Sequence, residues 1–134
     1  MTHSSPLFVP VLCSAAVALL PQGVFMSPDF GLVDEADMQR RGYIDFFING
    51  SYRIGIEITR DGKDLQEHTA RFDAKTGNYA PLNLKSWVVV DFRQTKPRTT
   101  TGNAGTVFVV FSADFKHATI MQKQRKDEHF VLLP

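Results

Sequence analysis

The chain has 134 residues, of which 43% are hydrophobic and 22% are charged, a composition that indicates one compact domain and excludes a disordered segment. The formal net charge of +1 excludes a strong overall attraction to nucleic acid or to an anionic membrane, so such a contact must use a local patch. The single cysteine, Cys13, excludes an internal disulfide bond.

The N-terminal segment "PLFVPVLCSAAVALLP" (residues 6–21) is apolar enough to suggest a signal peptide. No Lys or Arg precedes it, "LLPQG" is a poor cleavage site, and the segment is too short to span a membrane. We therefore favour the alternative, a buried first helix over residues 11–20, and expect no membrane partner. Because Pro6 and Pro10 crowd this helix, we expect residues 1–134 to be a single domain that lacks an N-terminal segment of a longer protein.

The rest of the chain alternates between strand and helix patterns. We expect a strand at 23–27, a surface loop at 28–42, two strands around Asn49-Gly50, a helix over 61–72, a strand at 86–93, a loop at 94–105, and strands at 106–112, 118–122 and 129–133. Three successive valines in the segment 86–93 are typical of a strand that is covered on both faces. This order predicts an α/β fold with a single mixed β-sheet and flanking helices.

Within the predicted helix, Asp64 can cap the N-terminus, with Glu67 in the place that a capping box requires. Glu67 and Arg71 are spaced as an i,i+4 ion pair. His68 lies on the apolar face of this helix, where it can be a core residue capped by Asp64 or part of a site, and the spacing does not decide between the two.

The two strands around Asn49-Gly50 should form a hairpin with one buried face. Alternation of side chains places three apolar residues of each strand on one face: Ile44, Phe46, Ile48, Ile54, Ile56 and Ile58. A three-residue loop, residues 49–51, pairs Ile48 with Tyr52 and brings the two sets together, so we expect this register and one continuous buried surface.

The opposite face of this hairpin carries two acids. In the expected register Asp45 lies opposite Gly55, with Glu57 as its diagonal neighbour. Two carboxylates this close repel each other, and Gly55 leaves space beside them, so a hard divalent cation with oxygen ligands would fit. The alternative is a solvent-exposed polar face on which Arg53 and Arg60 neutralise the acids.

Five short motifs occur in order along the chain: "SPDFG", "YIDFFI", "GIEITRDG", "L-x-EH-x-x-RF" and "VVVDFR". This combination resembles the PD-(D/E)XK (restriction-endonuclease-like) superfamily, and most of all the C-terminal nuclease-like domain of Crinkler-type effector proteins. The resemblance covers residues 11–133. It implies a core of helix, three strands, helix and strand, followed here by C-terminal strands. It also implies a protein that is secreted into a host cell and acts in the host nucleus.

The resemblance implies that Asp45 and Glu57 bind Mg²⁺ or Mn²⁺ and cleave phosphodiester bonds of DNA or RNA. The superfamily places a lysine two residues after the glutamate, where this chain has Thr59, which cannot act as a base. Arg60 follows, but its pKa is too high for that role. His68 could serve as the proton acceptor instead.

Further residues are expected to support this site. Asp61 is a turn residue that could contact and orient the residues of the site, and Arg71 could contact nucleic acid. Asp91 and Arg93 end the central strand, where open α/β sheets tend to place ligands. The expected function is thus a Crinkler-like effector with metal-dependent nuclease activity. The alternative, favoured by Thr59, is a catalytically impaired relative that binds nucleic acid or protein.

Overall fold

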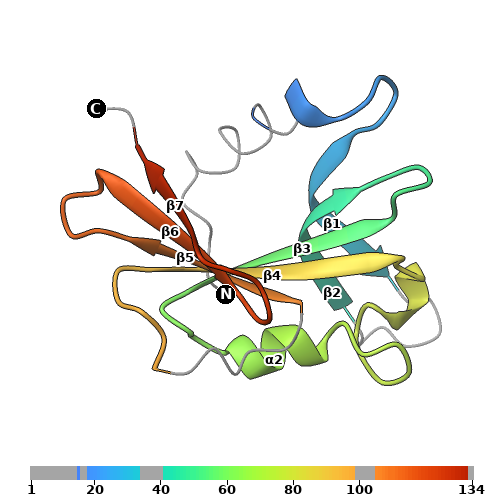
Figure 1. The fold of residues 1–134 in the computed structure, drawn as a ribbon. Helices are drawn as coiled ribbons and strands as arrows, with labels where there is room; N and C mark the ends of the chain where they lie inside the picture. Colours follow the sequence, from blue (N-terminus) through green and yellow to red (C-terminus); the bar gives the residue numbers. More distant parts are fainter. Residues whose placement is uncertain (1–14, 16–17, 34–40, 99–104, 133–134) are drawn as a thin grey trace.

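The fold is known from a computed structural model, which describes residues 15, 18–33, 41–98 and 105–132. These residues form one seven-stranded mixed sheet, whose strands lie side by side in the order in which they occur along the chain (Figure 1). The strands are β1 (Met26–Val33), β2 (Arg41–Ile48), β3 (Ile54–Arg60), β4 (Ser86–Arg93), β5 (Thr106–Phe111), β6 (His117–Gln122) and β7 (Glu128–Val131). A helix, α2 (Leu65–Ala70), and a short 3₁₀ helix, η1 (Ala80–Leu82), connect β3 to β4.

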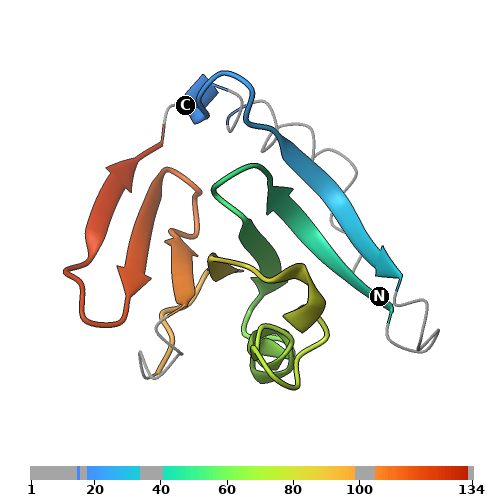
Figure 2. The same cartoon turned by 90° about the vertical axis from the view of Figure 1, so that its right-hand side faces the viewer.

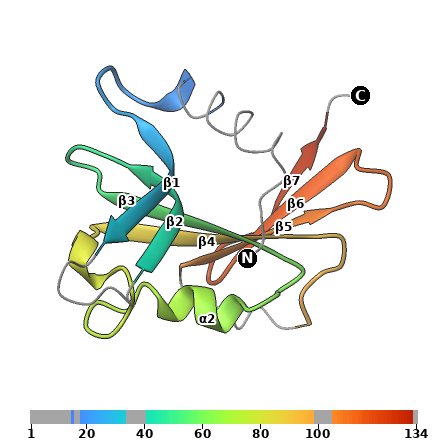
Figure 3. The same cartoon turned by 180° about the vertical axis from the view of Figure 1, so that it is seen from behind.

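The sheet is strongly twisted, with β1 to β3 on one side and β5 to β7 on the other (Figure 2). Helix α2 lies against one face below the middle of the sheet, as the opposite views of Figures 1 and 3 show. Strand β4 pairs in parallel with both β3 and β5, whereas the other neighbouring strands are antiparallel. The predicted α/β class with one mixed sheet is therefore confirmed.

The predicted surface loop at 28–42 is wrong where the structure describes it. Residues 28–33 continue β1, and Arg41 and Gly42 begin β2, while residues 34–40 lie outside the described part. Strand β1 has β2 as its only neighbour in the described sheet. An edge strand of this kind tolerates Pro28, because the ring removes no hydrogen bond from a second neighbour.

The hairpin between β2 and β3 has a different register from the one expected. Ile48 pairs with Ile54, so the connection is residues 49–53 and the prediction of a three-residue loop is wrong. The Arg53 side chain explains part of this geometry, because its Nε donates to Asn83 O at 3.0 Å and its guanidinium also donates to Leu82 O. The longer loop therefore brings Arg53 onto the 3₁₀ helix and away from the acids.

The face of β3 that is most buried is the one opposite to expectation. Gly55, Glu57 and Thr59 are buried on the face that α2 and the connection after it cover, whereas the isoleucines of β3 are only half-buried. In β2, Ile44, Phe46 and Ile48 are buried as expected, but Phe47 of the other face is buried as well, and Ile44 packs in the cluster beneath α2. Face alternation alone does not describe this hairpin, since the main core gathers on the α2 face.

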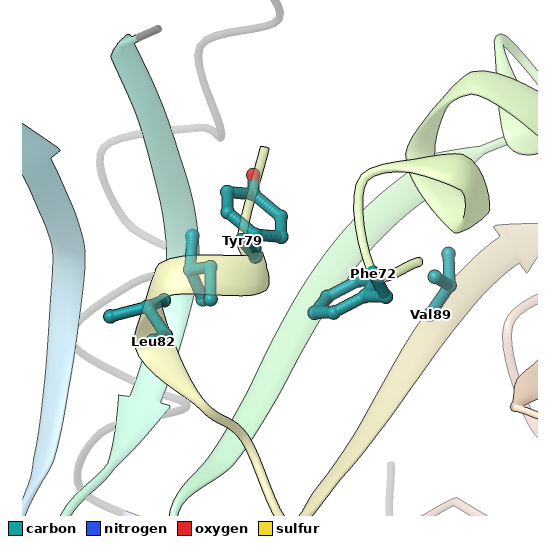
Figure 4. Close-up of a cluster of buried hydrophobic side chains, with 5 residues drawn as sticks. Phe72, Tyr79, Leu82 and Val89 are labelled. Carbon is teal, nitrogen blue, oxygen red and sulfur yellow. The ribbon is translucent and has the colours of Figure 1, made fainter. Parts of the chain in front are cut away.

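The core beneath α2 combines side chains from the sheet and from the long connection between β3 and β4. Phe72, Tyr79, Leu82 and Val89 form it together with Ile44 (Figure 4). The Phe72 ring stacks on Trp87 with centroids 4.7 Å apart and meets Tyr79 at 5.0 Å. These aromatic contacts fix the connection against the sheet and thereby position the polar side chains described below.

Helix α2 is shorter than predicted, and its cap differs. Asp64 is the N-cap residue, but it has a left-handed backbone (φ 51°) and its side chain makes no capping hydrogen bond. Of the predicted first helix only residue 15 and residues 18–20 are described, and Leu19 there is exposed. Among the described residues, no helix is long and apolar enough to cross a membrane.

Candidate functional site: a buried glutamate beneath helix α2

Glu57 lies in the middle of β3, and its side chain contacts His68 of α2. The residue is only 1% exposed, although it carries a carboxyl group. A carboxylate removed from water in this way costs free energy unless hydrogen bonds and cationic groups compensate. The structure supplies three such partners, two from α2 and its end and one from the connection that follows.

Helix α2 and the residue after it contribute a histidine and an arginine to Glu57. His68 Nδ1 lies 2.6 Å from Glu57 Oε2, and a guanidinium nitrogen of Arg71 lies 3.6 Å from the same oxygen. The two residues are three positions apart, so they lie on one side of the helical turn. Arg71 also donates to Glu67 at 2.8 Å, which confirms the predicted i,i+4 pair.

Tyr79 provides the third partner, which was not among the residues predicted for a site. Its hydroxyl donates to Glu57 Oε1 and lies 2.6 Å from the backbone carbonyl of Tyr43. The hydroxyl has one proton, so these two acceptors share it. Burial, reinforced by the negative charge of Glu57, raises the pKa of Tyr79 well above its usual range. The signal for this role was a lone tyrosine in the otherwise polar segment "DAKTGNY".

Gly77 allows the chain to bring Tyr79 into place. A Cβ at this position would lie 2.2 Å from the backbone oxygen of Arg71, a distance that no side chain tolerates. The same oxygen accepts a hydrogen bond from Tyr79 N at 3.0 Å. Asp73 closes the turn, since its Oδ1 accepts hydrogen bonds from Thr76 N at 2.8 Å and Lys75 N at 2.9 Å.

Asp45 lies beside this cluster on the neighbouring strand. Its Oδ2 accepts a hydrogen bond from the backbone N–H of Ile58 at 2.7 Å. The backbone pairing between β2 and β3 is regular only as far as Phe46 and Ile56, so the carboxylate replaces a carbonyl where the ladder ends. Asp45 therefore lies on β2 beside the Glu57 cluster, but its carboxylate is hydrogen-bonded to the backbone of β3.

As arranged, Asp45 and Glu57 do not form an open ligand set for Mg²⁺. Both oxygens of Glu57 are engaged, one by Tyr79 and the other by His68, and the cation of Arg71 is already nearby. A hard divalent cation needs several oxygen ligands and usually retains water. In the described residues, no group of three or more His, Cys, Asp or Glu side chains could hold a metal ion.

A second buried carboxylate, Asp91, lies near the carboxyl end of β4 on the same face. It is fully buried, and its oxygens accept hydrogen bonds from Gly62 N at 3.0 Å and Arg93 Nε at 2.9 Å. Arg93 also lies over the ring of Phe108, 5.2 Å from its centroid. Asp91 therefore fixes the turn that leads from β3 into α2. This role is structural, although the sequence made Asp91 a candidate for contact with a ligand.

Thr59, at the position where the resemblance expects lysine, is buried on the same face of the sheet as Glu57 and Asp91. It pairs with Asp91 across the sheet, and Thr106 lies beyond β4 on the same face. Within the described part of the chain, neither threonine hydroxyl has a hydrogen-bond partner. Thr59 thus adds neither charge nor a base to the site.

Arg60 and Asp61 lie away from the Glu57 cluster. The Arg60 side chain is 86% exposed and pairs with Asp61 at 3.3 Å. Of the residues predicted for a site, the structure therefore brings together Glu57, His68 and Arg71, with Asp45 beside them.

No protein-family model, curated protein or solved structure matches this chain.

Proposed function

We propose that this chain is an effector module of the Crinkler type with a nuclease-like fold, and that it acts on the phosphodiester backbone of DNA or RNA through Glu57 and His68. Two observations support the proposal. The described elements follow the order of three strands, a helix and a strand, with acids on the second and third strands. The observation that carries it is the 2.6 Å contact between the buried Glu57 carboxylate and His68 Nδ1.

The Glu57–His68 pair has the geometry of an oriented general base. Because Nδ1 faces Glu57, only Nε2 of His68 can take a proton from an attacking water or sugar hydroxyl. The buried carboxylate then stabilises the imidazolium that forms. The protonated ring can return its proton to the leaving oxygen. No step in this scheme depends on a metal ion.

Arg71 is the residue best placed to hold the phosphate near His68. A guanidinium has five donors, and Glu57 and Glu67 engage only part of the Arg71 fork. Its side chain is 29% exposed, so a ligand can reach it from the solvent side of α2. A phosphate there would lie beside the base and would have its charge partly neutralised.

A second candidate function is nucleic-acid binding without cleavage. The observation that favours it is the engagement of both Glu57 oxygens by Tyr79 and His68, together with Thr59 in place of the expected lysine. In this case the cluster stabilises the fold and has no reacting partner. The two candidates make different predictions for the same substrates.

The test uses end-labelled single-stranded and duplex DNA and RNA, incubated with the wild-type protein in Mg²⁺, in Mn²⁺ and in EDTA. The proposal expects cleavage that His68→Ala and Glu57→Gln abolish. His117→Ala is the matched control, because His117 is an exposed histidine on β6. Binding without cleavage supports the second candidate, and neither binding nor cleavage contradicts both. Cleavage that EDTA abolishes would show that the reaction depends on a metal ion and would contradict the metal-free scheme.

A further inference from the structure

Three phenylalanine rings form a continuous row on the face of the sheet opposite α2, which we call the aromatic ledge. Its members are Phe92 of β4, Phe111 of β5 and Phe115 of the turn between β5 and β6. The Phe92 and Phe111 rings are stacked with centroids 6.0 Å apart, and Phe111 meets Phe115 at 5.7 Å. The row runs from the half-buried sheet outward to a ring that is 57% exposed.

The turn presents Phe115 in a fixed and unusual conformation. Its backbone has φ 56°, a region that bulky residues rarely occupy and that persists only where the surroundings impose it. Phe115 N donates to Ser112 O at 2.9 Å, while Asp114 Oδ1 accepts hydrogen bonds from Ser112 Oγ at 2.6 Å and Lys116 N at 3.0 Å. This network also holds the pKa of Asp114 below its usual value, chiefly through the Ser112 hydroxyl and the Lys116 backbone. The hydrogen bonds of this turn therefore hold the Phe115 ring in an exposed position.

Cationic side chains lie near the aromatic ledge, where β3 and β4 end and in the turn that carries Phe115. Arg60 is the pairing partner of Phe92 in the ladder between these strands, and its side chain is 86% exposed. Lys116 follows Phe115 directly and is exposed, as is Lys96 in the segment after β4. Asp61 neutralises part of the Arg60 charge at 3.3 Å. These strand ends reach the same side of the molecule (Figure 1).

We propose that the aromatic ledge binds single-stranded nucleic acid, with a base stacked on Phe115 and phosphates near Arg60 and Lys116. The choice of a nucleic acid rests on the proposed function. Exposed rings flanked by cations are the elements with which proteins bind single strands, because unpaired bases stack on aromatic side chains. A duplex hides the faces of its bases, so the ledge should discriminate against it.

The test measures fluorescence anisotropy of labelled dT₁₂ and rU₁₂ strands, with a labelled 12-base-pair duplex for comparison. Phe115→Asn removes the ring and keeps a residue that tolerates the left-handed backbone, and we expect it to weaken single-strand binding about tenfold, in line with the loss of one stacked base. Phe115→Trp should retain binding. Tyr52→Ala is the matched control, because Tyr52 is an exposed tyrosine in the loop at the opposite end of β3.

A salt titration tests the cations. Arg60→Gln should reduce the slope of log affinity against log salt concentration by the amount that corresponds to about one phosphate contact. It should weaken binding to strands of different sequence to a similar extent. Equal affinity for duplex and single strand, or an affinity that Phe115→Asn leaves unchanged, would overturn the inference. Failure to bind nucleic acid combined with loss of a protein contact in Phe115→Asn would assign the ledge to a protein partner and overturn it as well.

The outcomes also separate the ledge from the proposed cleavage site. Single-strand binding that depends on Phe115 supports the ledge, even if the wild-type protein cleaves no substrate. Cleavage that depends on His68 but is insensitive to Phe115→Asn, both in KM and in kcat, supports the proposed function and overturns the ledge. If both hold, Phe115→Asn should raise KM for single strands and leave kcat unchanged.

Discussion

His68 Nδ1 and Glu57 Oε2 lie 2.6 Å apart, although they belong to a helix and a strand that are separated by a turn. This contact joins α2 to the middle of the sheet at a buried position. Both side chains are largely buried, so water supplies few hydrogen bonds to them, and each depends on the other for its hydrogen bond.

We therefore predict that Glu57→Gln lowers the free energy of unfolding by about 1 to 3 kcal/mol, the cost of leaving buried polar groups poorly paired. Urea denaturation measures this value, and Glu128→Gln on the exposed strand β7 serves as the control. In a double-mutant cycle with His68→Ala, the two losses should be less than additive. Additive losses would show that the contact contributes nothing of its own.

Tyr79 should make stability depend on alkaline pH. Burial raises its pKa in the folded state, so its contribution to stability is fully present below about pH 10, the pKa of an unfolded tyrosine, and is lost as the pH rises above that value. In the folded protein, the absorbance rise at 295 nm should fall short of the three-tyrosine total until the chain unfolds. Tyr79→Phe should remove this shortfall. A complete rise in the folded wild-type protein would contradict the buried hydrogen bond.

Gly77→Ala should be among the most damaging small substitutions in the connection. The new Cβ would lie 2.2 Å from the Arg71 carbonyl oxygen, so the backbone must move and Tyr79 must leave Glu57. We expect a loss of about 2 kcal/mol or more, as for other strained backbone positions. Thermal unfolding followed by circular dichroism measures this loss. Asn78→Ala, a change at the exposed next residue, should cost little.

The two faces of the hairpin predict unequal costs of truncation. Ile44 is fully buried in the cluster beneath α2, so Ile44→Ala should cost about 2 to 5 kcal/mol. Ile56 is only half-buried on the opposite face, and Ile56→Ala should cost less. Equal losses in a denaturant titration would mean that the opposite face is as well packed as the α2 face.

Much of the sheet could be predicted from local pattern. The strand at Ser86–Arg93 was expected with the observed bounds, because three successive valines leave little alternative. The continuation of β1 over residues 28–33 was missed because the segment 28–42 is polar and irregular, and only the place of β1 at the sheet edge explains how Pro28 fits.

Except for Tyr79, the members of the site were predictable from the sequence, but their contacts were not. The sequence identifies Glu57 and His68 as candidates and predicts the Glu67–Arg71 pair, which is confirmed. It could not show that Glu57 is buried, because the three isoleucines of β3 made the other face appear to be the core. That outcome depends on which face α2 covers, and no local pattern determines this choice.

The order of the strands has a consequence for folding. Strands β1 to β3 are joined by hairpins, as are β5 to β7, and contacts of this kind form within about 1 to 10 μs. Strand β4 joins these two groups through parallel pairings that require the closure of residues 61–85 and 94–105. Until β4 inserts, both groups present an unpaired edge, and the apolar β4 itself is exposed. Refolding should therefore show its greatest tendency to aggregate before β4 inserts, and protection of the β4 amides against hydrogen exchange should appear last.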